Sequence, residues 1–185
     1  MKTTPVTKED LLRSVIAVPP MARHADFSLN KDANRALIAH LESGGVRSIM
    51  YGGNANFYHI ALSEYAATLD FLAEAAGQDT WILPSLGPDY GKAIDQAAII
   101  KSSKYPTAMV LPMTFPFTDE GLGIGIRRIT DAMGKPAVVY IKSAPYLKPA
   151  TLKALIDEGR VASVKYAPVR ADPAKDDYLR ALCDA

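Results

Sequence analysis

The feature that most constrains the fold is a regular alternation of apolar, strand-like runs with amphipathic, helix-like segments along the whole chain. The strand candidates are residues 14–22, 46–53, 80–87, 107–113, 136–143 and 161–169. They are mostly continuous apolar runs, which is typical of parallel strands covered on both faces. Helix candidates lie between them, such as "NKDANRALIAHLESGG" (30–45) and "KPATLKALIDEG" (148–159), each of which ends at glycine.

The repeat of about 25 to 35 residues is the spacing of βα units joined by right-handed crossovers. Six such units fit either an open doubly wound sheet or most of a (β/α)₈ barrel. A complete barrel usually takes about 250 residues, whereas this chain has 185. We expect residues 1–185 to form a single α/β domain, an incomplete TIM barrel of about the first six βα units, within a longer polypeptide.

Composition and charge narrow the range of partners. The chain is 49% hydrophobic and 22% charged, with a net charge of +1, and it has no basic cluster interleaved with aromatic residues, so we expect no nucleic-acid or membrane partner. One cysteine, Cys183, excludes an intramolecular disulfide and fits a reducing compartment. No run approaches the roughly 18 apolar residues of a membrane span. We therefore expect a soluble, cytoplasmic protein.

Two residues near the ends of the last two predicted strands, Tyr140 and Lys165, are candidates for a catalytic role. Side chains alternate along a strand, so Ser163 and Lys165 share one face, as do Tyr140 and Lys142 on the neighbouring strand. If these faces point into a barrel, Lys165 and Tyr140 meet at its mouth. An amine in apolar surroundings has a lowered pKa and becomes a nucleophile toward carbonyls, and a phenol can carry the protons. Spacing alone leaves open that the lysine reaches water and the tyrosine only packs.

A family resemblance adds to this reading. Several segments, in order, resemble the dihydrodipicolinate synthase / N-acetylneuraminate lyase family of class I, lysine-dependent aldolases and lyases, which are (β/α)₈ barrels. The segments are "VIAVPPMA" (15–22), "GGVRSIMYGGNANFYHIALSEY" (44–65), "TDEGL" (118–122), "PAVVYIK" (136–142) and "SVKYA" (163–167).

The resemblance implies roles for particular residues. Lys165 would form a Schiff base with a 2-oxo acid such as pyruvate or a deoxy-sugar acid, and Tyr140 would relay protons. Gly53 and Asn54 stand where the family has two threonines, so their backbone amides would hold the substrate carboxylate, and the Asn54 side chain could donate as well. The family also implies a lyase without metal or organic cofactor that forms homo-oligomers, dimers or tetramers.

The chain departs from the family pattern in three places. "GGNAN" (52–56) replaces the Gly-Thr-Thr-Gly-Glu sequence of the dihydrodipicolinate-forming subgroup, Met113 and Thr114 replace its adjacent tyrosines, and Pro145 falls near its carboxylate-binding arginine. Lys142 is the nearest cation in sequence and is therefore a candidate substrate-binding residue. These changes argue against lysine biosynthesis and favour a 2-oxo acid aldolase or a sugar-acid dehydratase of the 5-dehydro-4-deoxyglucarate type.

Other interpretations stay open. The far end of the substrate would be contacted by Phe57, Tyr58 and Lys142, and His59 either lines the pocket or lies on the surface. Arg170, near the exit of the last strand, either attracts a carboxylate or forms a structural ion pair. The chain could also be a non-catalytic relative that binds or scaffolds without turnover, or an open doubly wound binding protein without Schiff-base chemistry.

Overall fold

The strands pair in the order in which they occur along the chain, and every pair is parallel. The computed structural model describes residues 1–114 and 116–185. The strands are β1 (Ile16–Ala17), β2 (Ser48–Tyr51), β3 (Trp81–Leu86), β4 (Met109–Val110), β5 (Ala137–Ile141) and β6 (Val161–Tyr166). The helices are α1 (Lys8–Leu12), α2 (Lys31–Ser43), the 3₁₀ turn η1 (Phe57–His59), α3 (Leu62–Ala75), α4 (Tyr90–Ser102), α5 (Asp119–Met133), α6 (Pro149–Asp157) and α7 (Asp177–Asp184).

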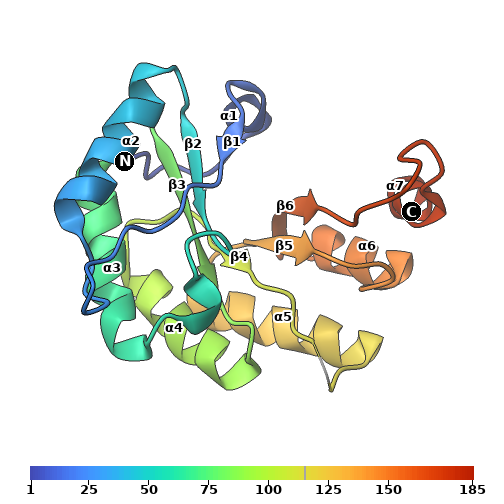
Figure 1. The fold of residues 1–185 in the computed structure, drawn as a ribbon. Helices are drawn as coiled ribbons and strands as arrows, with labels where there is room; N and C mark the ends of the chain where they lie inside the picture. The colour runs from blue at the N-terminus through green and yellow to red at the C-terminus, as the bar shows by residue number, and fades with distance from the viewer. Residues whose placement is uncertain (115) are drawn as a thin grey trace.

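This strand order distinguishes the two architectures that the repeat allows. In a doubly wound sheet the strand order reverses at a switch point, so some strands that are consecutive in sequence do not pair. Here every strand pairs with its sequence neighbour, and the sheet curls with helices on its outer side (Figure 1). The predicted fold class is confirmed as a partial (β/α)₈ barrel, and the alternative of an open doubly wound sheet is wrong.

Two strands are much shorter than predicted, each reduced to two residues and followed closely by proline. The first predicted strand, 14–22, is reduced to β1, and Pro19 and Pro20 follow it closely; the fourth, 107–113, is reduced to β4, with Pro112 beyond it. Proline has no N–H to donate to the next strand and so weakens the ladder of hydrogen bonds where it occurs, although β3 continues through Pro84, the register partner of Tyr51.

Burial is greatest in the middle of the sheet and least at its last strand. Every residue of β2, β3 and β4 is buried. Strand β6 pairs only with β5 within the described part of the chain, and its Ala162 and Val164 side chains are exposed, Val164 to 36%. A strand edge of this kind presents unpaired backbone groups next to apolar side chains.

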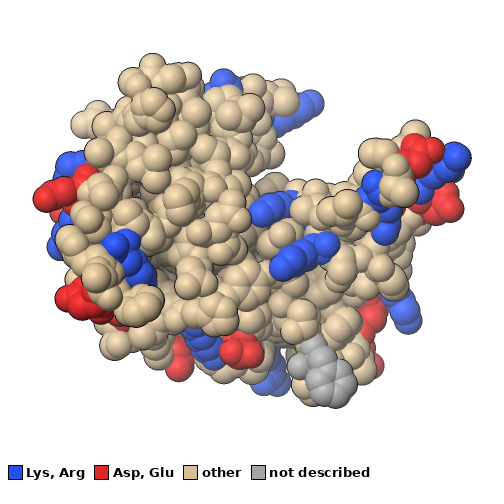
Figure 2. Space-filling view, in the orientation of Figure 1, with Lys and Arg blue, Asp and Glu red and all other residues tan. Residues whose placement is uncertain are grey.

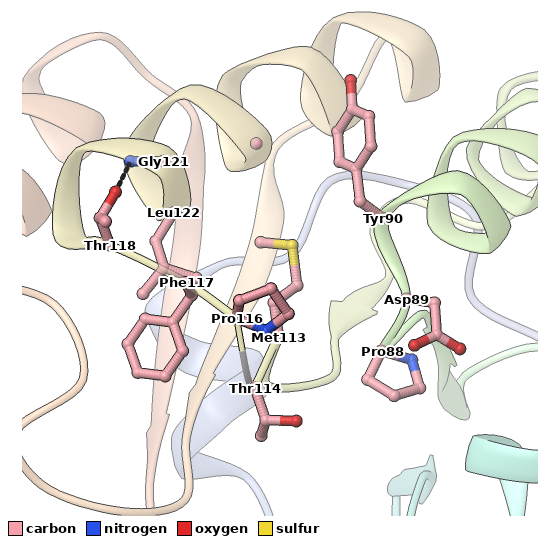
Figure 3. A pocket seen from close by; sticks show the side chains of 11 residues that line it. Pro88, Asp89, Tyr90, Met113, Thr114, Pro116, Phe117, Thr118, Gly121 and Leu122 are labelled. Atoms are coloured by element: carbon pink, nitrogen blue, oxygen red, sulfur yellow. Dashed lines mark hydrogen bonds between the residues drawn. The ribbon is translucent and has the colours of Figure 1, made fainter.

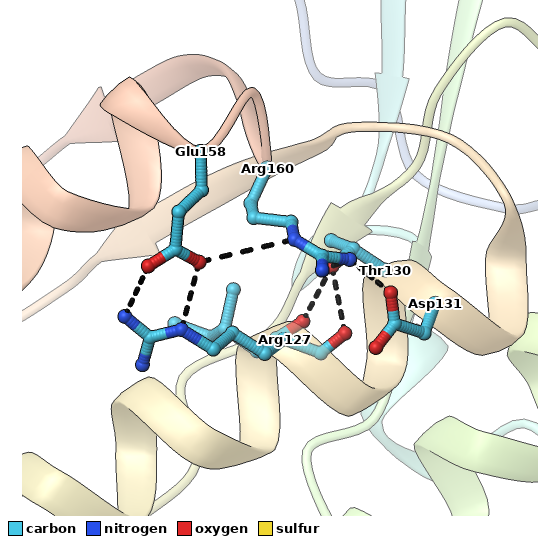
Figure 4. A network of polar contacts seen from close by, with 6 residues as sticks. Arg127, Thr130, Asp131, Glu158 and Arg160 are labelled. Carbon is cyan, nitrogen blue, oxygen red and sulfur yellow. Dashed lines mark hydrogen bonds and ion pairs between the residues drawn. The ribbon is translucent and has the colours of Figure 1, made fainter.

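A polar network ties α5 to the loop between α6 and β6 (Figure 4). The Arg127 guanidinium donates two hydrogen bonds to the Glu158 carboxylate, at 2.8 and 2.6 Å, and Arg160 donates to Asp131 and to Thr130. Arg160 comes directly before β6, at the amino end of the strands. Because the active sites of such barrels lie at the opposite end, this network stabilises the fold and takes no part in the site.

Candidate active site

Tyr140 and Lys165 meet at the carboxyl ends of β5 and β6. The two residues are register partners across this strand pair, and Lys165 Nζ lies 4.1 Å from the centroid of the Tyr140 ring. Alternation along both strands sends these side chains to the inner face of the sheet. Tyr166, the next residue, points to the other face, where its hydroxyl donates to Asp176 at 2.7 Å. The structure therefore brings together the two residues that were predicted to carry the chemistry.

Lys165 is half-buried and makes no hydrogen bond or ion pair with the described residues. Burial lowers the pKa of its amine, and the positive charge of Lys142 lowers this pKa further. The Tyr140 ring acts in the opposite sense, since its negative face favours the charged ammonium. With no carboxylate paired to it, the amine loses its proton more readily than an ordinary lysine and can then attack a carbonyl.

Tyr140 is partly buried, and this burial raises the pKa of its phenol, so the hydroxyl keeps its proton at neutral pH. Among the residues that the structure describes, none forms a hydrogen bond with this hydroxyl. A protonated phenol next to the amine can donate a proton to a leaving oxygen and take one back. Neither Gly53 nor Asn54 supplies a hydroxyl that would extend this relay.

The loop after β2 forms the opposite side of the site. The Phe57 N–H donates to Gly52 O at 3.1 Å and the Asn56 N–H to Gly53 O at 2.9 Å, which folds the loop into a tight turn. The N–H groups of residues 53–55 have no intramolecular acceptor within the described ranges. Consecutive free N–H groups in a turn can hold an anion; of these residues Gly53 and Asn54 line the adjoining cavity, whereas Ala55 is buried.

Gly52 is required for this loop to follow the strand closely. A Cβ at Gly52 would lie 2.9 Å from Met109 Cε and 3.2 Å from Ser85 Oγ, both in the fully buried centre of the barrel. The loop can therefore start directly above the packed core because residue 52 has no side chain. This contact connects the packing of β2, β3 and β4 to the position of the Gly53 and Asn54 amides.

The Asn54 side chain has a structural contact as well as a place in the site. Its Nδ2 donates to Val18 O at 3.0 Å and so joins the β2 loop to the segment after β1. The prediction that this side chain could donate to a substrate applies only to the remaining N–H of the amide.

A cavity of about 480 Å³ connects the loop with β5. It is lined by Gly53, Asn54, Asn56, Tyr58, His59, Tyr140 and Lys142. Lys142 is exposed, and its Nζ lies 5.5 Å from the centroid of the Tyr58 ring. Four of the five predicted site residues thus line one cavity, and the fifth, Lys165, lies against the Tyr140 ring. Figure 2 shows basic side chains, and no acidic ones, at the inner end of the hollow between the two ends of the sheet.

The structure corrects the interpretation of one aromatic residue and reveals a contact that sequence reasoning missed. Phe57 was expected to contact the far end of the substrate, but it is 1% exposed and packs between Tyr51 and Tyr65. Lys92, in the first turns of α4, donates from Nζ to Tyr58 O at 3.0 Å and so fixes the loop that carries Tyr58. The contact spans 34 residues of sequence, so only the fold could have shown it.

Arg170 has an intramolecular partner. It donates to both carboxylate oxygens of Asp176, at 2.9 and 3.2 Å, and Asp176 also accepts from the Leu179 N–H at the start of α7. These contacts hold the pKa of Asp176 well below its usual range. Of the two interpretations of Arg170, the structure therefore favours the structural ion pair over a substrate contact.

A second cavity, of about 560 Å³, lies between the starts of α4 and α5 (Figure 3). Met113 and Thr114 line it together with Asp89 and Tyr90. Thr118 at its edge accepts a hydrogen bond from the Gly121 N–H at 3.0 Å as the cap of α5. None of the five predicted site residues lines this cavity.

No cluster of His, Cys, Asp and Glu that could hold a metal ion occurs in residues 1–114 and 116–185. The same ranges hold no helix that is both long and apolar enough to cross a membrane.

Comparisons with known proteins bear on the fold. No family model and no curated protein sequence matches the chain. Solved structures do match: N-acetylneuraminate lyase from Proteus mirabilis has 17% identity and a TM-score of 0.77 over 90% of this chain and 58% of that one. Dihydrodipicolinate synthase from Oceanobacillus iheyensis has 19% identity and a TM-score of 0.74, covering 84% of this chain and 52% of that one.

A third match is a prophage protein of the dihydrodipicolinic acid synthase family from E. coli K12, in complex with pyruvate. It has 20% identity and a TM-score of 0.73, and the alignment covers 90% of this chain and 57% of that one. The chain thus spans little more than half the length of the structures it matches. At these identities the comparisons establish that it has the barrel fold of these proteins over that part of their length.

Proposed function

We propose that the chain belongs to the dihydrodipicolinate synthase / N-acetylneuraminate lyase family and carries the Schiff-base site of a class I lyase. Its substrate would be a 2-oxo acid, such as pyruvate or a deoxy-sugar acid. The observation that carries the proposal is a half-buried lysine amine, without a polar partner among the described residues, that lies 4.1 Å from the centroid of a tyrosine ring at the carboxyl ends of adjacent strands. The shared fold supports it, because the matching structures include lyases of this family.

The proposed chemistry starts at the Lys165 amine. Its lone pair forms a bond to C2 of the 2-oxo acid, and a proton passes from nitrogen to the ketone oxygen to give a carbinolamine. That hydroxyl takes a further proton and leaves as water, which leaves a protonated imine. In this scheme Tyr140 exchanges both protons.

The protonated imine then acts as an electron sink. When a bond from C3 to C4 or to hydrogen breaks, its electron pair forms the C2–C3 double bond of an enamine and neutralises the nitrogen. In aldol cleavage the C4 hydroxyl loses its proton to become a carbonyl; in dehydration the C4 hydroxyl leaves after the C3 proton. Throughout, the substrate carboxylate would be held by the N–H groups of Gly53 and Asn54.

Imine trapping tests the proposal. The protein is incubated with pyruvate and sodium borohydride, and its intact mass is measured. We expect one reduced adduct per chain in the wild type and none in Lys165→Ala. The adduct should be unchanged in Lys104→Gln, which alters an exposed lysine far from Lys165 in the sequence. A wild-type protein without adduct, or an adduct that persists in Lys165→Ala, would refute it.

A second candidate, a relative that forms the imine without turnover, is favoured by one observation. The Tyr140 hydroxyl has no hydrogen-bond partner among the described residues, so the proton relay is incomplete within them. Exchange of the pyruvate methyl protons for deuterium, followed by NMR, separates the candidates. A working site catalyses the exchange through the enamine, whereas a binding site forms the adduct without exchange.

A further inference from the structure

Tyr140 needs a partner with which it exchanges the protons that it gives and takes. Its hydroxyl has no hydrogen-bond partner among the described residues, and the turn at Gly53 and Asn54 brings no hydroxyl to it. A general acid that has given up its proton must take up another before the next cycle. The residues that line the cavity together with Tyr140 are therefore the candidates for this partner.

Three of these lining residues, Tyr58, His59 and Lys142, carry a group that can exchange protons. The His59 and Lys142 side chains are exposed, whereas Tyr58 is half-buried and packs against the core, as Tyr140 does. Burial raises the pKa of the Tyr58 phenol, and the negative charge of a Tyr140 phenolate raises this pKa further. The two phenols are thus within electrostatic reach of each other.

Contacts on several sides hold Tyr58 in place. Its carbonyl accepts a hydrogen bond from Lys92 Nζ at 3.0 Å, and the preceding residue, Phe57, is 1% exposed in the core. Its ring lies against Gly53, where a Cβ would come within 3.5 Å of Cε2, and the Lys142 ammonium lies 5.5 Å from the ring centroid. A proton carrier that is already in position needs little reorganisation when the proton moves.

We infer that Tyr58 relays protons between Tyr140 and the solvent at the mouth of the cavity. No hydrogen bond joins the two hydroxyls within residues 1–114 and 116–185, so a water molecule in the cavity would bridge them. The relay keeps the Tyr140 hydroxyl in exchange with solvent while a substrate occupies the cavity. This inference rests on the proposed Schiff-base function and adds a residue to it.

The relay acts on the proton that Tyr140 removes from the substrate. As the carbinolamine loses water, the Tyr140 O–H gives its proton to the departing hydroxyl and becomes a phenolate. The phenolate takes a proton from C3, and the electron pair of that C–H bond forms the C2–C3 double bond of the enamine. Tyr58 then passes this proton to the solvent and passes one solvent proton back to Tyr140, so the net charge does not change. Reversal of the C3 step places the new proton on the substrate.

Hydrogen exchange and imine trapping distinguish this relay from a structural role. In deuterium oxide, NMR follows the loss of the pyruvate methyl protons, which needs the relay in every cycle. Borohydride trapping of the adduct on Lys165 records a single dehydration, in which Tyr140 uses a proton that it already holds.

Tyr58→Phe removes the hydroxyl and keeps the ring that lies against Gly53. We expect it to slow the exchange by about tenfold, less than the roughly hundredfold effect of a group that acts directly on the substrate. The rate of trapping should stay unchanged. A substitution that merely disturbed the site would slow both processes.

Tyr90→Phe is the matched control, because Tyr90 is 42% exposed and lines the other cavity. Both rates should equal those of the wild type. Chemical rescue gives a second measurement at constant pH. Imidazole, a mobile proton carrier, should restore the exchange in Tyr58→Phe and should leave the exchange in the wild type unchanged.

The outcomes separate this inference from the function beneath it. Unchanged exchange in Tyr58→Phe, equal slowing of exchange and trapping, or wild-type exchange that rises with imidazole would each overturn the relay and leave the proposed function standing. Slower exchange in His59→Gln but not in Tyr58→Phe would do the same.

Two results in the wild type reach further. An adduct that forms without any exchange would overturn the relay and favour the relative without turnover. If no adduct forms, both proposals fall. The response of wild-type exchange to imidazole decides the inference should Tyr58→Phe fail to fold.

Discussion

Replacing Gly52 with alanine tests whether the loop after β2 depends on close packing above the barrel core. The new Cβ would lie 2.9 Å from Met109 Cε and 3.2 Å from Ser85 Oγ, and both neighbours are 0% exposed. Overpacking of this kind destabilises the folded state by about 1–3 kcal/mol. Replacing glycine also reduces the conformational entropy of the unfolded chain, which stabilises the folded state by about 0.4–1 kcal/mol. We expect the free energy of unfolding to fall by about 1–2 kcal/mol, which lowers Tm by about 2–8 °C in a protein of this size.

The neighbouring glycine is the matched control. A Cβ at Gly53 would meet Tyr58 Cε2 at 3.5 Å, an ordinary van der Waals distance, and its φ is not in the left-handed region. Gly53→Ala should therefore be neutral or slightly stabilising. Urea unfolding is followed by the fluorescence of Trp81, the single tryptophan, which is 1% exposed.

A double-mutant cycle identifies the contact responsible. Met109→Ala alone should cost about 2–5 kcal/mol because it leaves a cavity. The double variant, Gly52→Ala with Met109→Ala, should lose about 1 kcal/mol less stability than the sum of the two single variants, because the alanine methyl at residue 52 enters the space freed at residue 109. If Gly52→Ala is as stable as Gly53→Ala, or if the two costs add, the reasoning about this contact is wrong.

Four further changes have defined outcomes. Tyr140→Phe should keep the fold and the imine but slow deuterium exchange of the pyruvate methyl group by about a hundredfold, because the proton carrier is lost; unchanged exchange by NMR would exclude that role. Lys165→Met should raise Tm at neutral pH, because the folded state holds the lysine at a lowered pKa. The gain in Tm should vanish as pH rises through the unfolded pKa of about 10.4. A gain in thermal melts that does not depend on pH would contradict the burial argument. Asp176→Asn should destabilise the protein near neutral pH through loss of the Arg170 contacts. Because the pKa of Asp176 is lowered in the folded state, the difference should shrink as pH falls below about 4, and a constant difference in urea melts would argue against it. We also propose that the chain self-associates, as its family resemblance implies; Val164→Lys, on the exposed face of β6, should shift light-scattering mass toward monomer, and an unchanged mass would place the contact elsewhere.

Much of the fold could be predicted from the sequence because each βα unit carries its own local signals. Continuous apolar runs mark buried parallel strands, and glycines follow the ends of α2, α5 and α6. Strand lengths were less predictable, because Pro19, Pro20 and Pro112 lie just beyond short strands whereas Pro84 lies within β3.

The site was predictable where it depends on strand alternation and unpredictable where it depends on the loops. The register of β5 and β6 places Tyr140 beside Lys165, as the alternation requires. Phe57 could not be placed, because an aromatic residue in a loop can turn either to the cavity or to the core. The contact of Lys92 with the Tyr58 carbonyl depends on how two units pack together, which no local pattern contains.

The central claim is that Lys165, among all the lysines of the chain, is the one that condenses with a 2-oxo acid. Peptide mapping by mass spectrometry after treatment with pyruvate and borohydride measures this directly. The account predicts a single modified peptide in which Lys165 has gained the mass of pyruvic acid less one oxygen atom. Modification at Lys142, or scattered over exposed lysines with Lys165 untouched, would contradict it.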